Sequence, residues 1–547
     1  MMTNDDENKQ YIHLVIGITG HRDIVDENKD SLKNEIREFF QGLKSKFTNT
    51  PLLLLTSLAE GADRIAAQVA LEEKINYIVP LPLPIDEYSK DFPNTKEEFS
   101  DLLRKSLGYF ELPYYESEIK AFSNYGPERN KRYEYAGAYI VRNSQILIAL
   151  WNGEYVSSKG GTSEIVKFKL KGLPPEYAPN ITLLDSQDNG PVFHILTRRR
   201  KSLDKTKDYF PERWKIYPDA MNEEYFFGRD GIFSKIDKFN EKIKKLNDDE
   251  IEKSRETLAS SVKDKEKFVS FIYAEADILA IKYKRRWSLL QIFLISIVGI
   301  LLGLFLLYIN LQIFYLLIIY AAAYITFALM FKVKDLPREY HRNYFDYRAM
   351  AEGLRVEFFL RLAGIHEDIS NLYLRKHSLH MRWVREVMRS ANLFDPQKEP
   401  DIEAIKNYWI NSQYDYYKNS SEKNFRIERN LTRTSYILFS LGVTSILGAI
   451  ALNLLYLYNV LSITIALIIT LPFFAGLIET YITRSAIKET AYEYSRMKKL
   501  FENAINLLKV VDNDQHILII SELGKEALRE NADWLLMHDR IPDKIPL

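Results

Sequence analysis

Three short turns rich in glycine and small polar residues carry side chains of the kinds that bind phosphate. Each turn follows an apolar run of strand length, or comes soon after one, and precedes an amphipathic segment. A helix that begins at such a turn offers unpaired backbone N–H groups and the positive end of its dipole, and both favour an anion. Hydroxyl and guanidinium groups in the turns add donors and positive charge. The turns span residues 17–22, 56–64 and 160–164.

A single turn of this kind is also an ordinary strand-to-helix connection, so each candidate residue has a second interpretation. Glu60 and Asp63 can bind ribose hydroxyls or cap the helix that follows. His21 can contact a phosphate or a base, or act as a plain hydrogen-bonding residue. Because the three turns are expected at one edge of a sheet, we interpret them jointly as a nucleotide pocket. The residues expected to line it are Gly20, His21, Arg22, Ser57, Glu60, Gly61, Asp63, Arg64, Arg132, Trp151, Gly160, Gly161, Thr162 and Glu164.

The segments around these turns alternate between short apolar runs and amphipathic stretches. This alternation predicts an α/β, Rossmann-like domain with a mostly parallel, doubly wound sheet, in which ligands bind at the carboxyl ends of the strands. Strands are expected at residues 12–18, 52–55, 77–80, 146–150 and 192–196. Helices are expected near residues 30–44, 62–73, 93–106, 133–142 and 163–171.

The composition excludes several kinds of site. The 547 residues include 74 basic and 74 acidic side chains, so no global charge favours a nucleic acid as partner. Cysteine is missing from the sequence, which excludes disulfides, zinc–thiolate sites and thiol nucleophiles. No metal or cofactor is expected, and the ligand is expected to be a nucleotide or a nucleotide-derived molecule.

Two stretches, residues 287–331 and 434–478, each run 45 residues without a charged side chain or a histidine. About 20 apolar residues cross a bilayer, so each stretch predicts a hairpin of two membrane helices. We expect the four spans at about 288–308, 312–331, 435–456 and 459–479, followed by long cytoplasmic helices. Basic residues flank both hairpins and are missing from their turns, and the first ten residues are polar rather than a signal peptide. We therefore expect a multi-pass protein of the inner (cytoplasmic) membrane with both termini in the cytoplasm.

Stripes of small residues occur in the first and third expected spans. Ser296, Gly299 and Gly303 form one stripe, and the other runs from Gly442 to Asn453. Small faces let helices approach closely, so they indicate helix packing or a polar path through the membrane. The hairpins also resemble a diverged duplication, because apolar positions at helical spacing follow both at equal distances.

The turns resemble motifs of the SLOG superfamily of Rossmann-like proteins. The blocks Thr-Gly-His-Arg, Ser-Leu-Ala-Glu-Gly-Ala-Asp-Arg and Gly-Gly-Thr-x-Glu, with Leu-Pro-Leu-Pro and Asp-Phe between them, match in order and spacing over about residues 11–215. Some members are phosphoribohydrolases and others are nucleotide sensors of bacterial immunity. Here Glu164 follows Thr162 by two residues rather than three and the loop lacks a proline, a departure that places hydrolysis in doubt.

The hairpins, together with residues 346–357 and 523–534, are similar to SLATT domains, two-helix membrane effectors that are associated with nucleotide signalling. The resemblance implies three domains: residues 1–230 (SLOG-like), 231–400 (first SLATT-like) and 401–547 (second SLATT-like). It implies pore formation in response to a nucleotide second messenger, including cyclic species, in antiphage defence. The expected partners are the lipid bilayer, further copies of the chain and a signal-producing enzyme encoded elsewhere.

Three functions remain open from the sequence. The leading hypothesis is a nucleotide-gated membrane effector, in which the ligand shifts the cytoplasmic helices and a homo-oligomeric pore opens. The second is a membrane-tethered nucleotide N-glycosidase that uses Glu164 with Arg22 or Arg132. The third is a scaffold whose hairpins anchor a regulatory domain.

Overall fold

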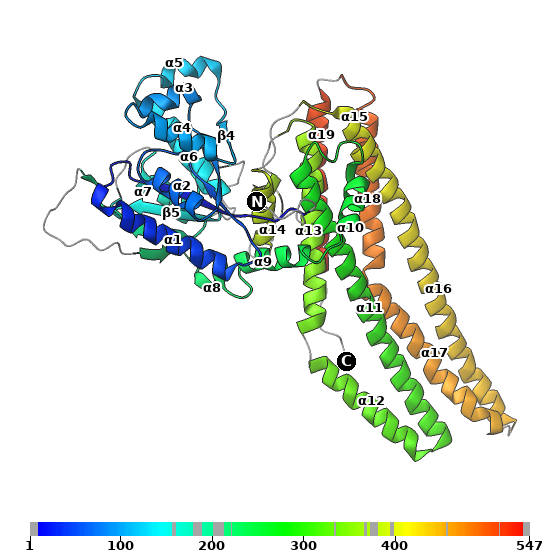
Figure 1. Cartoon of the computed structure of the whole chain (residues 1–547). Helices are drawn as coiled ribbons and strands as arrows, with labels where there is room; N and C mark the ends of the chain where they lie inside the picture. Colours follow the sequence, from blue (N-terminus) through cyan, green and yellow to red (C-terminus); the bar gives the residue numbers. More distant parts are fainter. Residues whose placement is uncertain are drawn as a thin grey trace. The chain divides into compact units, whose positions relative to one another are not determined.

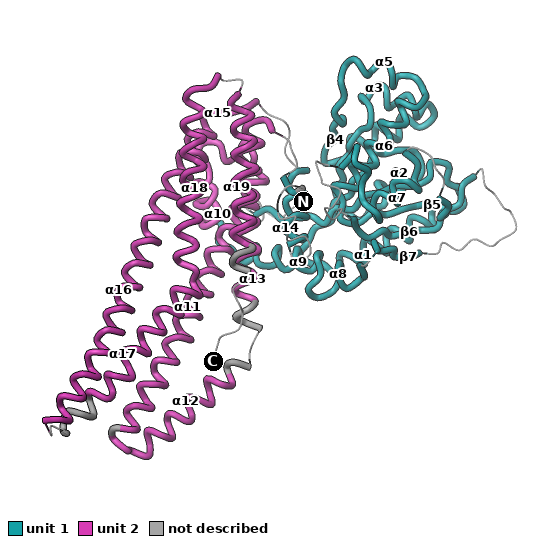
Figure 2. Tube along the Cα trace, turned by 180° about the vertical axis from the view of Figure 1, so that it is seen from behind, with its two compact units in different colours: residues 1–248, 368–395 teal, residues 249–367, 396–547 magenta. Residues whose placement is uncertain are grey.

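The computed structural model of the chain combines an α/β portion with an all-helical portion (Figure 1). Residues 1–248 and 368–395 form unit 1, and residues 249–367 and 396–547 form unit 2 (Figure 2). Each unit is thus built from two separate stretches of sequence. The structure describes residues 9–155, 160–178, 189–200, 213–219, 221–332, 335–365, 369–371, 373, 381–393, 399–455, 458–512 and 515–539.

Unit 1 is organised around a seven-stranded sheet with the strand order β4-β3-β2-β1-β5-β6-β7. All neighbouring strands pair in parallel except β6 and β7, which are antiparallel. The order changes direction at β1, which lies between β2 and β5, and ligands bind at such a switch point in doubly wound folds. The strands are β1 (Leu14–Gly20), β2 (Leu52–Leu55), β3 (Asn76–Leu81), β4 (Gly108–Glu111), β5 (Ile146–Trp151), β6 (Val192–Leu196) and β7 (Arg213–Ile216).

The predicted α/β class with a mostly parallel sheet is confirmed, and all five predicted strands occur near their expected bounds. Strands β4 and β7 were not predicted because neither contains a continuous apolar run. Both lie at sheet edges, where one side of a strand needs no partner. The helices of unit 1 are α1 (Lys29–Lys46), α2 (Ala62–Glu72), α3 (Ile85–Tyr88), α4 (Lys96–Lys105), α5 (Ile119–Phe122), α6 (Pro127–Asn143), α7 (Thr162–Lys171), α8 (Glu223–Phe227), α9 (Ile232–Ile243) and α14 (Arg382–Ala391).

Helices cover both faces of this sheet because its strands are apolar on both faces. Residues of α6 and α7 share one buried core with Val15, Leu53 and Val192. The next residue of β6, Phe193, points to the other face, as alternation along a strand requires. There it stacks on Phe39 of α1, with 4.1 Å between ring centroids.

Unit 1 extends beyond the boundary at residue 230 that the sequence suggested. Asn240 of α9 is fully buried, and its amide both accepts from the Ile12 N–H (3.0 Å) and donates to the Ile12 carbonyl (2.9 Å). Asp237 accepts hydrogen bonds from Asn49 and Thr50 at 2.9 Å. Helix α9 therefore completes the α/β unit.

Helix α14 comes from the segment between the two apolar hairpins, yet it belongs to unit 1. The sequence placed its residues in a membrane-associated domain of residues 231–400. All ten residues of α14 are buried. The helix lies at the amino ends of the strands, where Ser390 Oγ donates to the His13 carbonyl (3.2 Å), just before β1. The sequence did not predict this burial. The helix carries three arginines and a glutamate, and such charged side chains usually indicate a face that is exposed to solvent.

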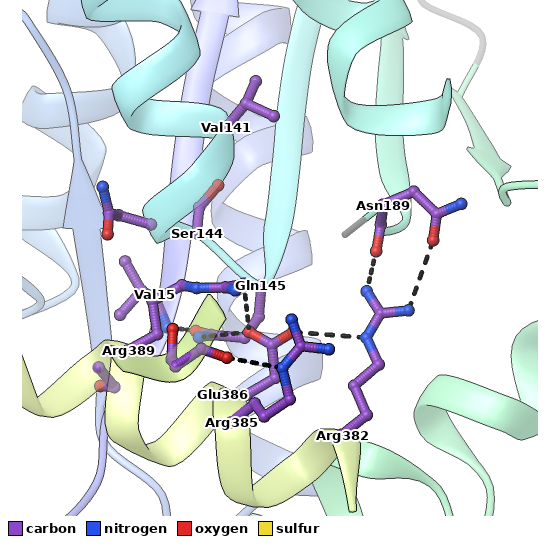
Figure 3. A network of polar contacts seen from close by, with 12 residues as sticks. Val15, Val141, Ser144, Gln145, Asn189, Arg382, Arg385, Glu386 and Arg389 are labelled. Atoms are coloured by element: carbon purple, nitrogen blue, oxygen red, sulfur yellow. Dashed lines mark hydrogen bonds and ion pairs between the residues drawn. The ribbon is translucent and has the colours of Figure 1, made fainter. Parts of the chain in front are cut away.

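Those charged residues are accommodated by a polar network (Figure 3). The Gln145 amide bridges sheet and helix: its Oε1 accepts from Val15 N (2.7 Å) and its Nε2 donates to Glu386 Oε2 (3.2 Å). Glu386 also lies 3.5 Å from Arg382 Nε and 3.6 Å from Arg389 Nη1. Arg382 donates to both oxygens of Asn189, which precedes β6. Buried charges need such partners, so the amino edge of the sheet specifies where α14 docks.

Unit 2 is entirely helical in its described residues. The two halves have corresponding parts: a long helix, a return helix and a further helix that packs beside the first. Tyr347, Met350, Leu354 and Phe358 of the first half are buried, as their helical spacing predicted. The helices are α10 (Asp248–Ala259), α11 (Lys267–Leu311), α12 (Phe314–Lys332), α13 (Asp335–Leu362), α15 (Ile402–Ala404), a π-helix (Ile405–Asn411), α16 (Ser412–Leu454), α17 (Tyr458–Arg484), α18 (Ile487–Leu507) and α19 (His516–Asp539).

Three helical stretches of unit 2 are long and apolar enough to cross a membrane: residues 267–309, 402–454 and 464–507. The fourth expected span, in α12, has a shorter apolar stretch at residues 314–329. The first predicted turn is present, because Gln312 adopts φ 51° and ends α11. The second predicted turn includes residues 456 and 457, which lie outside the described residues.

The small-residue stripes differ in what they contact. A Cβ on Gly442 would lie 2.6 Å from Cγ of Pro472 in α17, and a Cβ on Gly299 would lie 3.3 Å from the Phe474 ring. Ser435 Oγ donates to the Ala475 carbonyl (3.2 Å), which joins α16 to α17. A Cβ on Gly303 would meet nothing within 4 Å. The stripe at Gly442 is therefore a helix-packing surface.

This difference predicts opposite effects of one methyl group. Gly442→Ala is expected to destabilise unit 2 by about 1–3 kcal/mol, because the proline ring cannot move aside without shifting its helix. Gly303→Ala is the matched control and is expected to be neutral or stabilising by up to about 1 kcal/mol, because alanine favours a helix. Thermal unfolding of the detergent-solubilised protein measures both. Equal stability of the two variants would contradict the assignment of Gly442 to a helix-packing surface.

Candidate functional site

The candidate site lies at the carboxyl ends of β1, β2 and β5, next to the switch point of the sheet. The first two turns pack directly against each other there. Gly61 has φ +81°, and a Cβ on it would lie 2.4 Å from the His21 carbonyl oxygen. The Ala62 N–H donates to that same oxygen at 3.1 Å. Only glycine fits this approach, so the first N–H of α2 is already bonded within the protein.

Arg22 is the exposed charge of the first turn. Its guanidinium carbon lies 5.0 Å from the ring centroid of Tyr133, which belongs to α6. Within the described part of the chain it makes no hydrogen bond or ion pair, so all its N–H donors are available. A guanidinium in this state is suited to bind a phosphate in two-point fashion.

The third turn lies against the same helix α6. Gly160 has φ +71°, and a Cβ on it would lie 3.1 Å from the Asn130 carbonyl oxygen and 3.4 Å from Tyr133 Cβ. Tyr133 therefore borders both Arg22 and this turn. Gly161 precedes α7, which begins at Thr162, and the Thr162 hydroxyl is half-buried with no hydrogen bond to the described residues. The three predicted turns thus converge, and two of them retain donors for an anion.

Glu164 has a local partner. Its Oε2 accepts a hydrogen bond from the Gly160 N–H at 2.7 Å, across the start of α7. This contact closes the turn and balances the positive end of the helix dipole. In this position the carboxylate holds the turn that precedes α7, and the geometry supports a positioning role for Glu164 rather than proton transfer.

Several predicted residues hold the loops in place. His21 Nε2 accepts from the Asn152 N–H (3.0 Å), and burial lowers the pKa of His21, so the ring joins the ends of β1 and β5 as a neutral group. Ser57 Oγ donates to the Pro80 carbonyl (2.9 Å). Glu60 accepts from Thr95 Oγ1. These contacts fix the backbone around the crevice.

Two predicted arginines are also engaged by the protein. Arg132 donates to the carbonyl oxygens of Pro82 (2.9 Å), Pro113 (2.8 Å) and Leu112 (2.8 Å). Arg64 donates to the Leu58 carbonyl (3.1 Å) and pairs with Glu98 (2.8 Å). Neither has the free guanidinium of Arg22, so Arg22 is the cation of the site best placed for a ligand.

Trp151 ends β5 and is buried. Its carbonyl oxygen accepts from the Thr197 N–H (2.8 Å) and from His194 Nε2 (3.0 Å). Its indole Nε1 is buried and has no hydrogen-bond acceptor among the residues that the structure describes. The ring is edge-on to Tyr155, with 5.2 Å between centroids. Trp151 therefore forms an aromatic wall at the end of the strand.

A buried ion pair next to Tyr133 was not predicted from the sequence. Arg129 is almost fully buried and pairs with Asp91 (2.7 Å). Its Nε donates to the Tyr133 hydroxyl (2.7 Å), which in turn donates to Asp91 Oδ2 (2.5 Å). This network fixes the ring on which Arg22 lies. The available signal was the arginine in the first turn of α6, where the helix dipole disfavours a cation unless a carboxylate accompanies it.

The arrangement offers hydrogen-bond donors of the kind that suit an anion. Among the residues that the structure describes, no group of three His, Asp or Glu side chains could hold a metal ion. Comparisons of the chain with protein-family models, with curated proteins and with solved structures gave no match. The site is therefore interpreted from its own geometry.

Arg22 and Arg132 are expected to respond differently to truncation. Arg22→Ala should weaken binding of a phosphate-bearing nucleotide by about 1.5–3 kcal/mol, the usual contribution of a hydrogen bond to a charged group, with little change in thermal stability. Arg132→Ala should lower the melting temperature, because three backbone carbonyls, two of them partly buried, lose their donors. Calorimetric titration with a nucleotide panel, on the full chain because residues 368–395 complete unit 1, tests this. An unchanged affinity for Arg22→Ala would place the ligand elsewhere.

Asp63 predicts a pH dependence of stability. Burial raises its pKa to about 6, opposed by the Ala59 N–H and by Arg22. In the unfolded chain the group titrates near pH 3.8. The folded state therefore holds the proton more tightly, and its stability falls as the pH rises from about 4 to 6, by roughly 2–3 kcal/mol. Hydrogen exchange of residues 57–65 in the wild type and in Asp63→Asn measures this. Identical pH profiles would refute the assignment.

Proposed function

We propose that the chain is a nucleotide-responsive membrane effector. A small phosphate-bearing nucleotide, cyclic species included, binds the crevice of unit 1, and the helices of unit 2 respond by making the bilayer leak. The observation that carries the proposal is the free guanidinium of Arg22 at the switch point, in a chain that also has three long apolar helices. The resemblance to SLOG and SLATT proteins suggests that the nucleotide is a second messenger of antiphage defence, made by another enzyme.

The route from ligand to membrane helices runs through α14. The chain leaves unit 2 after residue 367, forms α14 within unit 1 and returns at residue 396. Inside unit 2 the base of this excursion is closed by a hydrogen bond from Asp401 N to the Leu362 carbonyl (2.8 Å). A shift of the sheet that moves α14 therefore pulls on the end of α13 and the start of α15. A ligand that favours one position of α14 therefore shifts the equilibrium between two arrangements of the helices in unit 2.

The membrane part of the proposal has four spans. We count helix α12 as the fourth span, beside the three longer helices, because basic residues flank both ends of its hairpin. Basic residues flank both ends of the second hairpin as well. This charge distribution supports a topology with unit 1 and both termini in the cytoplasm, at the inner membrane. Four helices per chain are too few to enclose a wide path, so a pore requires a symmetric homo-oligomer.

Glu164 weighs against the N-glycosidase alternative. Its carboxylate accepts a hydrogen bond from the Gly160 N–H. The spacing of Glu164 two residues after Thr162 therefore suits a role in holding the turn. The scaffold alternative, in which the hairpins only anchor unit 1, is also less well supported. An anchor would not require that a helix from between the two hairpins, α14, is built into unit 1.

The proposal predicts release of a trapped dye from proteoliposomes only when the nucleotide is added. Arg22→Ala should abolish release while membrane insertion persists, because the phosphate loses its cation. Glu386→Gln, which removes the carboxylate between Arg382 and Arg389, should leave nucleotide affinity near normal and lower the release. Fluorescence of the released dye and calorimetric affinity are measured on the same preparations.

Two results would contradict the proposal. A leak without nucleotide, equal in wild type and Arg22→Ala, would separate the membrane activity from the crevice. Nucleotide cleavage that disappears in Glu164→Gln would support the N-glycosidase instead.

Glu241→Gln, on the surface of α9, is the control for loss of a single carboxylate, because its exposed pair with Lys245 contributes less than about 1 kcal/mol.

A further inference from the structure

Unit 2 contains a cavity of about 340 Å³ that lies wholly among its own helices. This volume is at the lower end of the range of about 300–1,000 Å³ for small-molecule sites. Helices α11 and α13 of the first half and α16 and α18 of the second contribute to its wall, together with α10, α19 and the π-helix. The residues on α11 that line it precede the apolar run. The cavity therefore lies where the two halves meet, outside the apolar stretches.

One side of the cavity is cationic. Arg348 and Arg355 pair with the same carboxylate, Glu352, which lies 2.7 Å from Arg355 Nη1. Burial raises the pKa of Glu352, but the two arginines lower it below its usual value, so this group is an anion. Arg355 Nη2 also donates to the Tyr273 hydroxyl (2.7 Å).

Arg348 keeps donors for another partner. Its Nη1 lies 3.9 Å from Asp277 Oδ1, which is beyond hydrogen-bond distance. No described residue accepts a hydrogen bond from its Nε or Nη1, although the side chain is only 20% exposed. A guanidinium that is largely removed from water and has open donors favours a bound anion.

The rest of the wall suits a flat ring. Eight of the 22 lining residues are aromatic. Tyr494 of α18 lies 5.9 Å from Tyr416 and 5.6 Å from Tyr417 of α16, measured between ring centroids. Such rings stack on a nucleobase or a similar heterocycle.

An acidic pair faces the cavity from the second half. Glu493 and Glu530 both line it, and both contact Arg496, at 3.2 Å and 2.5 Å. Burial raises the pKa of Glu530, although Arg496 opposes this. Carboxyl oxygens accept hydrogen bonds from ring N–H and amino groups, which nucleobases carry.

We propose that this cavity is a second ligand site, which takes an anion with an aromatic, hydrogen-bond-donating ring, of the size of a nucleoside monophosphate. The guanidinium of Arg348 binds the anionic group, and the tyrosines of α16 and α18 hold the ring. Because the wall comes from both halves, occupancy of the cavity favours one arrangement of the two hairpins. The site is separate from the crevice of unit 1 and does not depend on the function proposed for it.

Photo-crosslinking tests the site on the full chain in neutral-lipid nanodiscs. The probes are 8-azido-AMP, 8-azido-GMP and 5-azido-UMP, and mass spectrometry locates the labelled peptides. At least one probe should label residues 408–417, 493–497 or 530–534. The matching unlabelled monophosphate should suppress this labelling, and the nucleoside without phosphate should need about tenfold more, because it lacks the anion.

Two variants and one control decide the assignment. Arg348→Gln should reduce labelling about tenfold. Ala280→Met fills the cavity without changing a charge and should also reduce it, which keeps the test valid if Arg348→Gln does not fold. Arg22→Ala should leave labelling of unit 2 unchanged, so failure of the crevice and failure of the cavity are distinguishable. Absence of label in unit 2, or label that persists in both variants, would overturn the proposal.

Discussion

Gln145 joins the amino end of the sheet to helix α14 through the two ends of one amide group. Its oxygen accepts from the backbone of β1, and its nitrogen donates to the carboxylate that lies between two arginines of α14. A buried arginine without a carboxylate or carbonyl partner would be strongly destabilising. The docking of α14 therefore depends on this edge of the sheet. Through α14, a segment that lies between the two apolar hairpins in the sequence becomes part of the α/β unit.

Local signals in the sequence predicted most of unit 1. Apolar runs such as residues 52–55 and 146–150 form strands, because a parallel sheet that is covered on both faces buries every side chain of such a run. The helices between the strands were predicted from their amphipathic spacing. Helix α14 could not be predicted in this way. Its partners, Gln145 and Asn189, are about 200 residues distant in sequence, and its charges read as a solvent-exposed helix. The same limit applies to the pair of Arg129 and Asp91.

In the candidate site, the sequence identified the turns but not the roles of their residues. Arginines 22, 64 and 132 have the same chemistry, and their spacing does not distinguish a ligand contact from a structural one. The distinction comes from the acceptors nearby: Arg132 has three backbone carbonyls and Arg64 has a carbonyl and Glu98, whereas Arg22 has an aromatic ring. The folded loops determine which backbone carbonyls lack a donor from the backbone. The sequence alone therefore does not show which arginine they engage.

The position of α14 in the chain has a consequence for biosynthesis. A ribosome makes residues 1–248 first, then the first apolar hairpin, and only afterwards residues 382–391. Until that point the amino edge of the sheet lacks its helix, with Gln145 and the backbone carbonyls of His13 and Asn189 still without the partners that α14 supplies. Domains generally fold in order as they are synthesised. Here the α/β unit receives its last helix only after the whole first apolar hairpin has been synthesised, so the unit completes its core late in synthesis.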